Sequence, residues 1–250
     1  SSQYVAWVFV STTLPSNGQL VSSTLVSTTF DIITDATAPN IEHMSVHTAT
    51  QNVTATIHAF VFDDQTTGAQ FANAGDSGAE YFKLYYATST WKDSASSTGV
   101  NLSGDLFSFT VTSTEGAVPA AGGTFKYYFK AIDRANNAKF FCADPSFTAA
   151  TSSCQTSPFT VTTIAAGSRT ATGTIRNSSD STAVAGAYVF AGGFAGSSVQ
   201  TDADGLYTIA NLPNNNSFDF TAAKVGFCKN IRFETIGTTN KQAVDMSLPL

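Results

Sequence analysis

Residues 124–133 read Thr-Phe-Lys-Tyr-Tyr-Phe-Lys-Ala-Ile-Asp, and their pattern indicates the fold class. Apolar side chains occupy alternate positions, with Lys126, Tyr128 and Lys130 between them on the opposite face, because successive side chains of an extended strand point to opposite faces. The residues that share one face are Phe125, Tyr127, Phe129 and Ala131. A strand with one buried face accounts for this pattern, whereas a helix would repeat its apolar positions every three to four residues.

The same alternation recurs at residues 53–61, 81–87 and 106–111, and clusters of Gly, Asn, Asp and Ser separate these runs. No stretch of helical period accompanies them. Short strands at regular spacing, with turn residues between them, are typical of β-sandwiches. The sequence therefore predicts an all-β protein of tandem immunoglobulin-like β-sandwiches with an incomplete strand pair at its N-terminal end.

The composition narrows the class of partner. The chain has 250 residues, of which only 12% are charged, and its formal net charge is −6. Its 12 Lys and Arg residues are scattered singly, so no basic patch is available to neutralise nucleic-acid phosphates. No run of 18 apolar residues predicts a membrane-spanning helix. We expect no nucleic-acid partner and no membrane span.

Residues 37–164 form the first predicted sandwich. The segments that mark it are TAPNIEHMSV, YFKLYYATSTW and FKYYFKAIDRANNA. This region resembles the immunoglobulin-like and fibronectin-III-like modules of secreted prokaryotic proteins. The resemblance implies a fold and an extracellular or cell-surface location, but no activity.

Residues 165–168, Ala-Ala-Gly-Ser, read as a linker to a second predicted sandwich at residues 169–250. The segments TATGTIRNSSDSTAVAGAYVFAGG, VQTDADGLYTIANLP and AVDMSL resemble the carboxypeptidase-regulatory-like (prealbumin-like) domain. That resemblance implies a small sandwich used as a structural or binding appendage. Asp204-Gly205 suits the tip of a tight hairpin, since such turns need residues with positive φ.

Residues 1–36 contain two predicted strands joined by a loop with Pro15 and Asn17-Gly18. The pair precedes the 37–164 region much as YYFKAID and FTVTTI precede the last domain, so it resembles an internal repeat whose front half is missing. Three explanations stay open. The chain was cut from a longer protein, the missing strands come from a neighbouring subunit, or the pair packs on its own neighbouring domain.

Both faces of the first strand are apolar, and a strand of that kind needs burial on both sides. If the chain polymerises by strand complementation, its partners are copies of itself, and a neighbour would bury the side chains of these strands. The candidate intersubunit residues are Tyr4, Ala6, Trp7, Val8, Phe9, Val10, Phe30 and Ile32. The leading functional hypothesis is an extracellular structural protein, a subunit of a cell-surface filament or adhesive array.

The alternative hypothesis is a non-catalytic spacer or glycan-binding appendage of a secreted hydrolase. Surface glycans or proteins would then be its partners. The exposed aromatic side chains that would form a platform for a sugar ring are Tyr81, Tyr85, Trp91 and Tyr128. Packing beneath a loop is the competing explanation for these four residues.

The sequence contains few candidate sites for a disulfide, a metal ion or a cofactor. Cys142 and Cys154 flank a loop and form a candidate disulfide, with three separate thiols as the alternative. Asp63, Asp64 and Asp133 are candidate calcium ligands at strand ends, and no other cofactor is predicted.

No catalytic residues emerge. The sequence has no Gly-x-Ser-x-Gly elbow, and its paired carboxylates suit turns better than a cleft. The three histidines, His43, His47 and His58, are expected on exposed strand faces. We therefore expect a protein that is not an enzyme.

Overall fold

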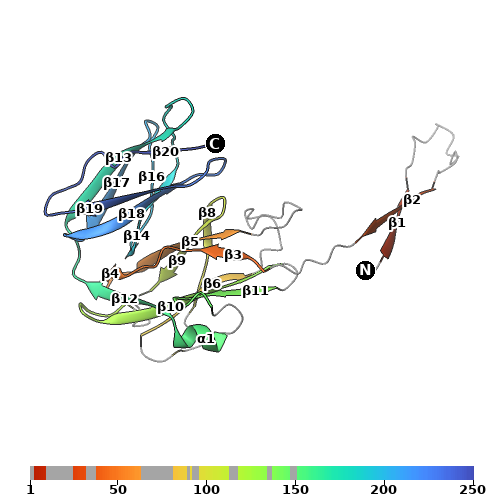
Figure 1. Ribbon diagram of the computed structural model, residues 1–250, viewed down its shortest axis with the longest axis horizontal. Helices are drawn as coiled ribbons and strands as arrows, with labels where there is room; N and C mark the ends of the chain where they lie inside the picture. Colours follow the sequence, from red (N-terminus) through yellow and green to blue (C-terminus); the bar gives the residue numbers. More distant parts are fainter. Residues whose placement is uncertain are drawn as a thin grey trace, which may run out of the picture. The chain divides into compact units, whose positions relative to one another are not determined.

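A computed structural model describes residues 3–9, 25–31, 38–62, 81–88, 91, 96–112, 118–133, 137–146 and 151–250 (Figure 1). The chain divides into two compact units, residues 1–36 and 37–250. The all-β prediction is confirmed, because the described elements are strands apart from the short helix α1 (Thr151–Thr156). The sequence did not predict that helix.

The first unit contains strands β1 (Gln3–Phe9) and β2 (Leu25–Asp31). They pair antiparallel in continuous register, from Gln3 opposite Asp31 to Phe9 opposite Leu25. Within the described residues they form a sheet of two strands only. A two-stranded sheet is marginally stable by itself in water.

Two sheets form the first sandwich of the second unit (Figure 1). One sheet has the order β3 (Asn40–Glu42), β5 (Ala55–Phe62), β9 (Leu106–Val111), β8 (Val100–Ser103). The other has the order β4 (Thr48–Thr50), β12 (Phe159–Ile164), β10 (Thr124–Ile132), β6 (Tyr81–Ala87), β7 (Ser96–Thr98), and β11 (Ala138–Phe141) also pairs with β10.

The alternating strand β10 lies in the middle of this second sheet and fills the core. Phe125, Tyr127 and Phe129 have no exposed surface, as the alternation predicts. Tyr128 points to the opposite face and is also buried, at 2% exposure. It packs with the partly buried Tyr85 and Trp91 on the face that carries Cys142 and Cys154, so β10 is covered on both sides.

The second sandwich also consists of two sheets. One has the order β17 (Leu206–Leu212), β13 (Arg169–Asn177), β20 (Met246–Leu248). The other has the order β16 (Val199–Gln200), β14 (Tyr188–Gly192), β18 (Asn216–Ala223), β19 (Asn230–Ile236). Residues 165–168 connect β12 to β13 without regular secondary structure.

The two sandwiches share a strand pairing. After β14 the chain passes Gly193 and forms β15 (Phe194–Ala195), which pairs in parallel with β4 of the first sandwich. The carbonyl of Gly193 accepts hydrogen bonds from the N–H groups of His47 and Thr48. A sheet of the first sandwich is therefore extended by residues of the second.

The tight turn expected at Asp204-Gly205 is present and is closed by hydrogen bonds from the Gly205 N–H to the Asp202 carbonyl and from the Asp202 N–H to the Leu206 carbonyl, but it does not join two strands of one sheet. Gly205 has the positive φ of 76° that a tight turn needs. The turn joins β16 to β17, and these strands belong to different sheets. The carboxylate of Asp202 accepts hydrogen bonds from the N–H groups of Asp204 and Leu206. This local bonding builds a turn that crosses from one sheet of the sandwich to the other.

Candidate functional site

The predicted intersubunit residues lie on paired strands. Tyr4 is opposite Phe30, Trp7 is opposite Ser27, and the first strand ends at Phe9. Ala6 and Val8 take the positions between, opposite Thr28 and Val26. Val10 and Ile32 lie outside the described residues. Every described pairing of these two strands is with each other.

The boundary between the two sandwiches is apolar and packed. Leu106 of the first sandwich and Phe190 and Ala223 of the second are buried together. The partly buried side chains around them are Met44, Phe60, Leu102 and Tyr188. Gly192 lies so close to Met44 that a Cβ atom there would meet the Met44 Cε at 2.5 Å. The same Cβ atom would come within 2.9 Å of the Asp219 carbonyl oxygen, so the backbone of β18 as well as Met44 restricts the side chain at position 192.

Lys229 adds charge to the rim of this boundary. It forms an ion pair with Glu42 of the first sandwich. Its Nζ also lies 4.4 Å from the ring centroid of Phe60 and 5.2 Å from that of Phe62. Cation–π contacts of this kind are favourable by about 0.5–2 kcal/mol. One lysine of the second sandwich thus contacts three residues of the first.

A chain of hydrogen bonds runs through the core of the first sandwich. The Val46 N–H donates to the Tyr127 hydroxyl at 3.0 Å, and the His43 Nε2 lies 2.6 Å from the same hydroxyl. His43 Nδ1 lies 2.7 Å from the carbonyl oxygen of His58. A carbonyl only accepts, so Nδ1 carries the proton and Nε2 accepts from Tyr127.

This arrangement keeps His43 neutral. Burial lowers its pKa from 6.5 to about 4, although the hydrogen bond to the His58 carbonyl partly opposes the shift. Burial also raises the pKa of Tyr127 well above its ordinary value. Both groups are committed to internal hydrogen bonds, so the triplet Val46–Tyr127–His43 serves packing and orientation.

His58 lies at the sandwich boundary. Its ring stacks on Phe190 with centroids 4.4 Å apart and planes 14° from parallel. The side chain is 6% exposed, and its Nε2 has no hydrogen-bond partner among the described residues. Burial lowers its pKa from 6.5 to about 3. The expectation of exposed histidines is wrong for His58 and for the half-buried His43, and only His47 is exposed.

Next to this stack is a pocket of about 380 Å³ between the sandwiches. Side chains from both sandwiches line it, including Ile41, His58 and Phe141 from the first and Phe190 and Ile231 from the second. The Nε2 atom of His58 is buried, so this polar atom adds little to the surface of the pocket. The wall of the pocket is mainly apolar, and the ion pair of Glu42 and Lys229 lies at its rim.

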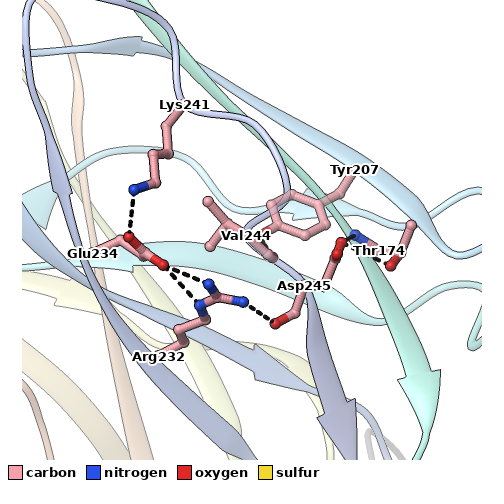
Figure 2. Close-up of polar contacts among 7 residues, drawn as sticks. All are labelled: Thr174, Tyr207, Arg232, Glu234, Lys241, Val244 and Asp245. Carbon is pink, nitrogen blue, oxygen red and sulfur yellow. Dashed lines mark hydrogen bonds and ion pairs between the residues drawn. The ribbon is translucent and has the colours of Figure 1, made fainter.

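A polar network closes one side of the second sandwich (Figure 2). Glu234 accepts from Arg232 at 2.7 Å and from Lys241 at 2.8 Å. The hydrogen bond from Lys241 is the main cause that holds the pKa of Glu234 below its ordinary value, with help from Arg232. Arg232 also donates to the carbonyl of Asp245, whose carboxylate accepts from the N–H and hydroxyl of Thr174. The network ties β19 to the segment before β20.

Cys142 and Cys154 form a disulfide with their Cα atoms 5.4 Å apart. The bridge joins the end of β11 to α1, and both cysteines are buried beside Tyr128. The Trp91 indole N–H donates to the carbonyl of Gln155 in the same helix. Because Tyr128 is buried and Tyr85 and Trp91 are partly buried, these side chains do not form an exposed platform for a sugar ring. The side chain of Tyr81 lies outside the described part.

Of the three candidate calcium ligands, the structure describes Asp133. Asp63 and Asp64 lie outside the described residues. Asp133 is buried, and its carboxylate accepts from the N–H and the side-chain amide of Asn137, both at 2.8 Å. The described residues contain no group of three or more acidic, His or Cys side chains able to hold a metal ion.

No helix in the described part of the chain is long and apolar enough to cross a membrane. The chain matches no protein-family profile. No curated protein matches it in sequence.

Solved structures give weak similarities. The Bacillus anthracis TIE protein is 12% identical over 84% of this chain, with a TM-score of 0.27, and the chain spans 40% of that protein. The major pilin subunit of Bacillus cereus is 10% identical over 98% of this chain and 85% of its own length, with a TM-score of 0.28. The group B streptococcus pilus 2b backbone protein is 11% identical over 84% of this chain and 97% of its own, with a TM-score of 0.28. Identities and TM-scores this low do not establish a shared fold or function.

Proposed function

We propose that this chain is a non-catalytic structural subunit of an extracellular assembly, and that the strand pair β1–β2 joins each copy to the next. The observation that carries the proposal is the pairing of β1 and β2 with each other alone among the described strands. Their sequence places apolar residues on both faces, so two strands cannot cover them. A partner that supplies further strands would bury those faces.

The body of residues 38–250 suits a structural role. Its two sandwiches share the β4–β15 pairing, an apolar boundary and the Lys229–Glu42 ion pair. Such a boundary resists bending between the domains. His58 is engaged in stacking, and His43 and Tyr127 are engaged in internal hydrogen bonds, which supports a role without catalysis.

The resemblance of residues 37–164 to secreted immunoglobulin-like modules, and of residues 169–250 to carboxypeptidase-regulatory-like domains, supports an extracellular location for this subunit. Neither resemblance implies an enzymatic activity, so both are consistent with a structural role.

The variant Trp7→Asp tests the proposal, because it places a charge on the face that a neighbour would bury. We expect it to remove every species heavier than the monomer of 26.2 kDa in sedimentation velocity. The control is Asn17→Asp in the predicted loop between the strands, which should assemble as the wild type does. Assembly of Trp7→Asp at the wild-type level would contradict the proposal.

A further inference from the structure

Strand β19 is a long edge strand with one unpaired side. It pairs with β18 alone among the described strands, in continuous register from Asn230 to Ile236. Apart from β18, no described segment forms a backbone hydrogen bond with β19. Alternate residues of an edge strand direct their N–H and C=O groups away from the sheet, and these groups form a template for a further strand.

The charged and the apolar side chains of β19 lie on opposite faces of the strand. Arg232 and Glu234 point toward the segment before β20 and are held by the polar network of Figure 2. Ile231 and Phe233 lie on the other face, 47% and 67% exposed. The charges of this strand are therefore satisfied internally, while Phe233 and Ile231, which also lines the pocket between the sandwiches, remain largely exposed.

Other edge strands of the 38–250 body differ from β19. β3, β7 and β20 have three residues each, β16 has two, and β8 has four with a register shift. β17 also has seven residues, but its pairing with β13 contains a register shift, and β19 contains none. Short edges and bulges discourage strand addition. The adjacent β20 is further covered, because side chains of Asn230 and Arg232 donate to the carbonyls of Ser247 and Asp245.

We propose that the open edge of β19 accepts strand β1 of a second copy of this chain. The inference rests on the function proposed above and names its acceptor. Both strands have seven residues, and β1, Gln-Tyr-Val-Ala-Trp-Val-Phe, carries no charge that pairing would bury. Added beside β19, its apolar side chains lie next to Ile231 and Phe233, in the cross-strand contacts that stabilise sheets.

Donor and acceptor are different surfaces of one chain, so each copy can give one strand and receive another. A head-to-tail contact of this kind generates a ring or an open filament. The order of the enlarged sheet would be β16, β14, β18, β19, β1, β2, which also gives the two-stranded sheet the additional strands that it needs.

Three full-length variants test the inference. Phe233→Lys places a charge on the acceptor face at an exposed position, and Trp7→Asp disables the donor. Leu206→Lys is the matched control, since Leu206 is 48% exposed on the other long edge strand, β17. Circular dichroism checks that each variant is folded.

We expect Leu206→Lys to assemble normally and the other two variants to stay monomeric when alone. An equimolar mixture of Phe233→Lys and Trp7→Asp should form a complex of twice the monomer mass and nothing heavier. Phe233→Lys then supplies the donor strand β1, and Trp7→Asp supplies the acceptor strand β19. The free donor and the free acceptor of this complex are both disabled, so no third copy can be added.

The remaining outcomes overturn the inference in distinguishable ways. If wild type and Leu206→Lys assemble and Phe233→Lys assembles equally well, β19 is not the acceptor, but the proposed function stands. If Trp7→Asp alone dimerises while Phe233→Lys does not, two β19 edges pair with each other. If the wild type is monomeric, the proposed function itself fails.

Discussion

Phe194 and Ala195 are consecutive residues that pack into two different hydrophobic cores. Phe194 belongs to the core of the second sandwich, and Ala195 belongs to the core of the first. Both are buried, at 7% and 4% exposure. The alternation of side chains along β15 produces this division, because successive residues of a strand point to opposite faces. The two sandwiches are therefore joined through a strand that serves both.

Phe190→Ala should destabilise the whole body of residues 38–250. The ring is 4% exposed and stacks on His58, so its loss leaves a cavity at the boundary. Removing a buried Phe side chain costs about 3–5 kcal/mol. The free energy of unfolding in urea measures the loss. Leu206→Ala is the control, since that side chain is 48% exposed on β17, and equal losses in both variants would contradict the packed boundary.

Tyr127→Phe should cost more stability than Tyr207→Phe. The Tyr127 hydroxyl accepts from Val46 and donates to His43, whereas the Tyr207 hydroxyl donates to the Val244 carbonyl. Each buried polar group left without a partner costs about 1–3 kcal/mol. Urea denaturation of the two variants at neutral pH ranks them. A smaller loss for Tyr127→Phe would show that the hydrogen-bond chain contributes little.

Acid should destabilise the fold through its buried histidines. His58 has a pKa of about 3 in the folded chain and an ordinary value of 6.5 when unfolded. Below pH 6.5 the unfolded chain therefore binds a proton that the folded chain does not, so stability falls as the pH drops from 6.5 toward 3. Each such group contributes at most about 1.4 kcal/mol per pH unit.

His58→Phe tests this dependence because it retains a ring against Phe190 and removes the titrating group. We expect the fall in unfolding free energy between pH 6.5 and 4 to be shallower in the variant. His43, with a pKa of about 4, keeps part of the slope. Identical slopes in the variant and the wild type would mean that His58 is not buried as described.

Removal of the disulfide should loosen the α1 region. The bridge closes a separation of 12 residues, for which loop-closure entropy gives a stabilisation of about 3 kcal/mol. A variant with Cys142→Ser and Cys154→Ser should lose about this amount. Cys228→Ser is the control, because Cys228 is free and exposed. The melting temperatures of the two variants provide the comparison, and no difference between them would contradict the prediction.

The sequence was sufficient to predict strands wherever one face is apolar and the other polar. The alternation at Phe125, Tyr127 and Phe129 is clear because each apolar side chain has a polar neighbour. Tyr128 was placed with the lysines on an outer face, since periodicity carries no information about what covers that face. The short helix that covers it depends on the disulfide and on the bond from Trp91 to Gln155.

Contacts between the sandwiches were missed for a similar reason. Phe190 lies in Tyr-Val-Phe-Ala-Gly, where apolar residues follow one another, and such a run is typical of a strand buried on both faces. We did not draw this prediction from the sequence. Nothing near Lys229 indicated its contacts, because Glu42 and Phe60 lie more than 160 positions away in the sequence. The sequence also does not show that one edge of β19 is unpaired, because this depends on which strands lie next to each other in the fold.

Sedimentation velocity of the wild-type chain over a concentration series measures its self-assembly. If β1–β2 joins copies, species heavier than 26.2 kDa should grow with concentration, and a variant with Trp7→Asp should lack them. A single species of monomer mass at every concentration would contradict self-assembly.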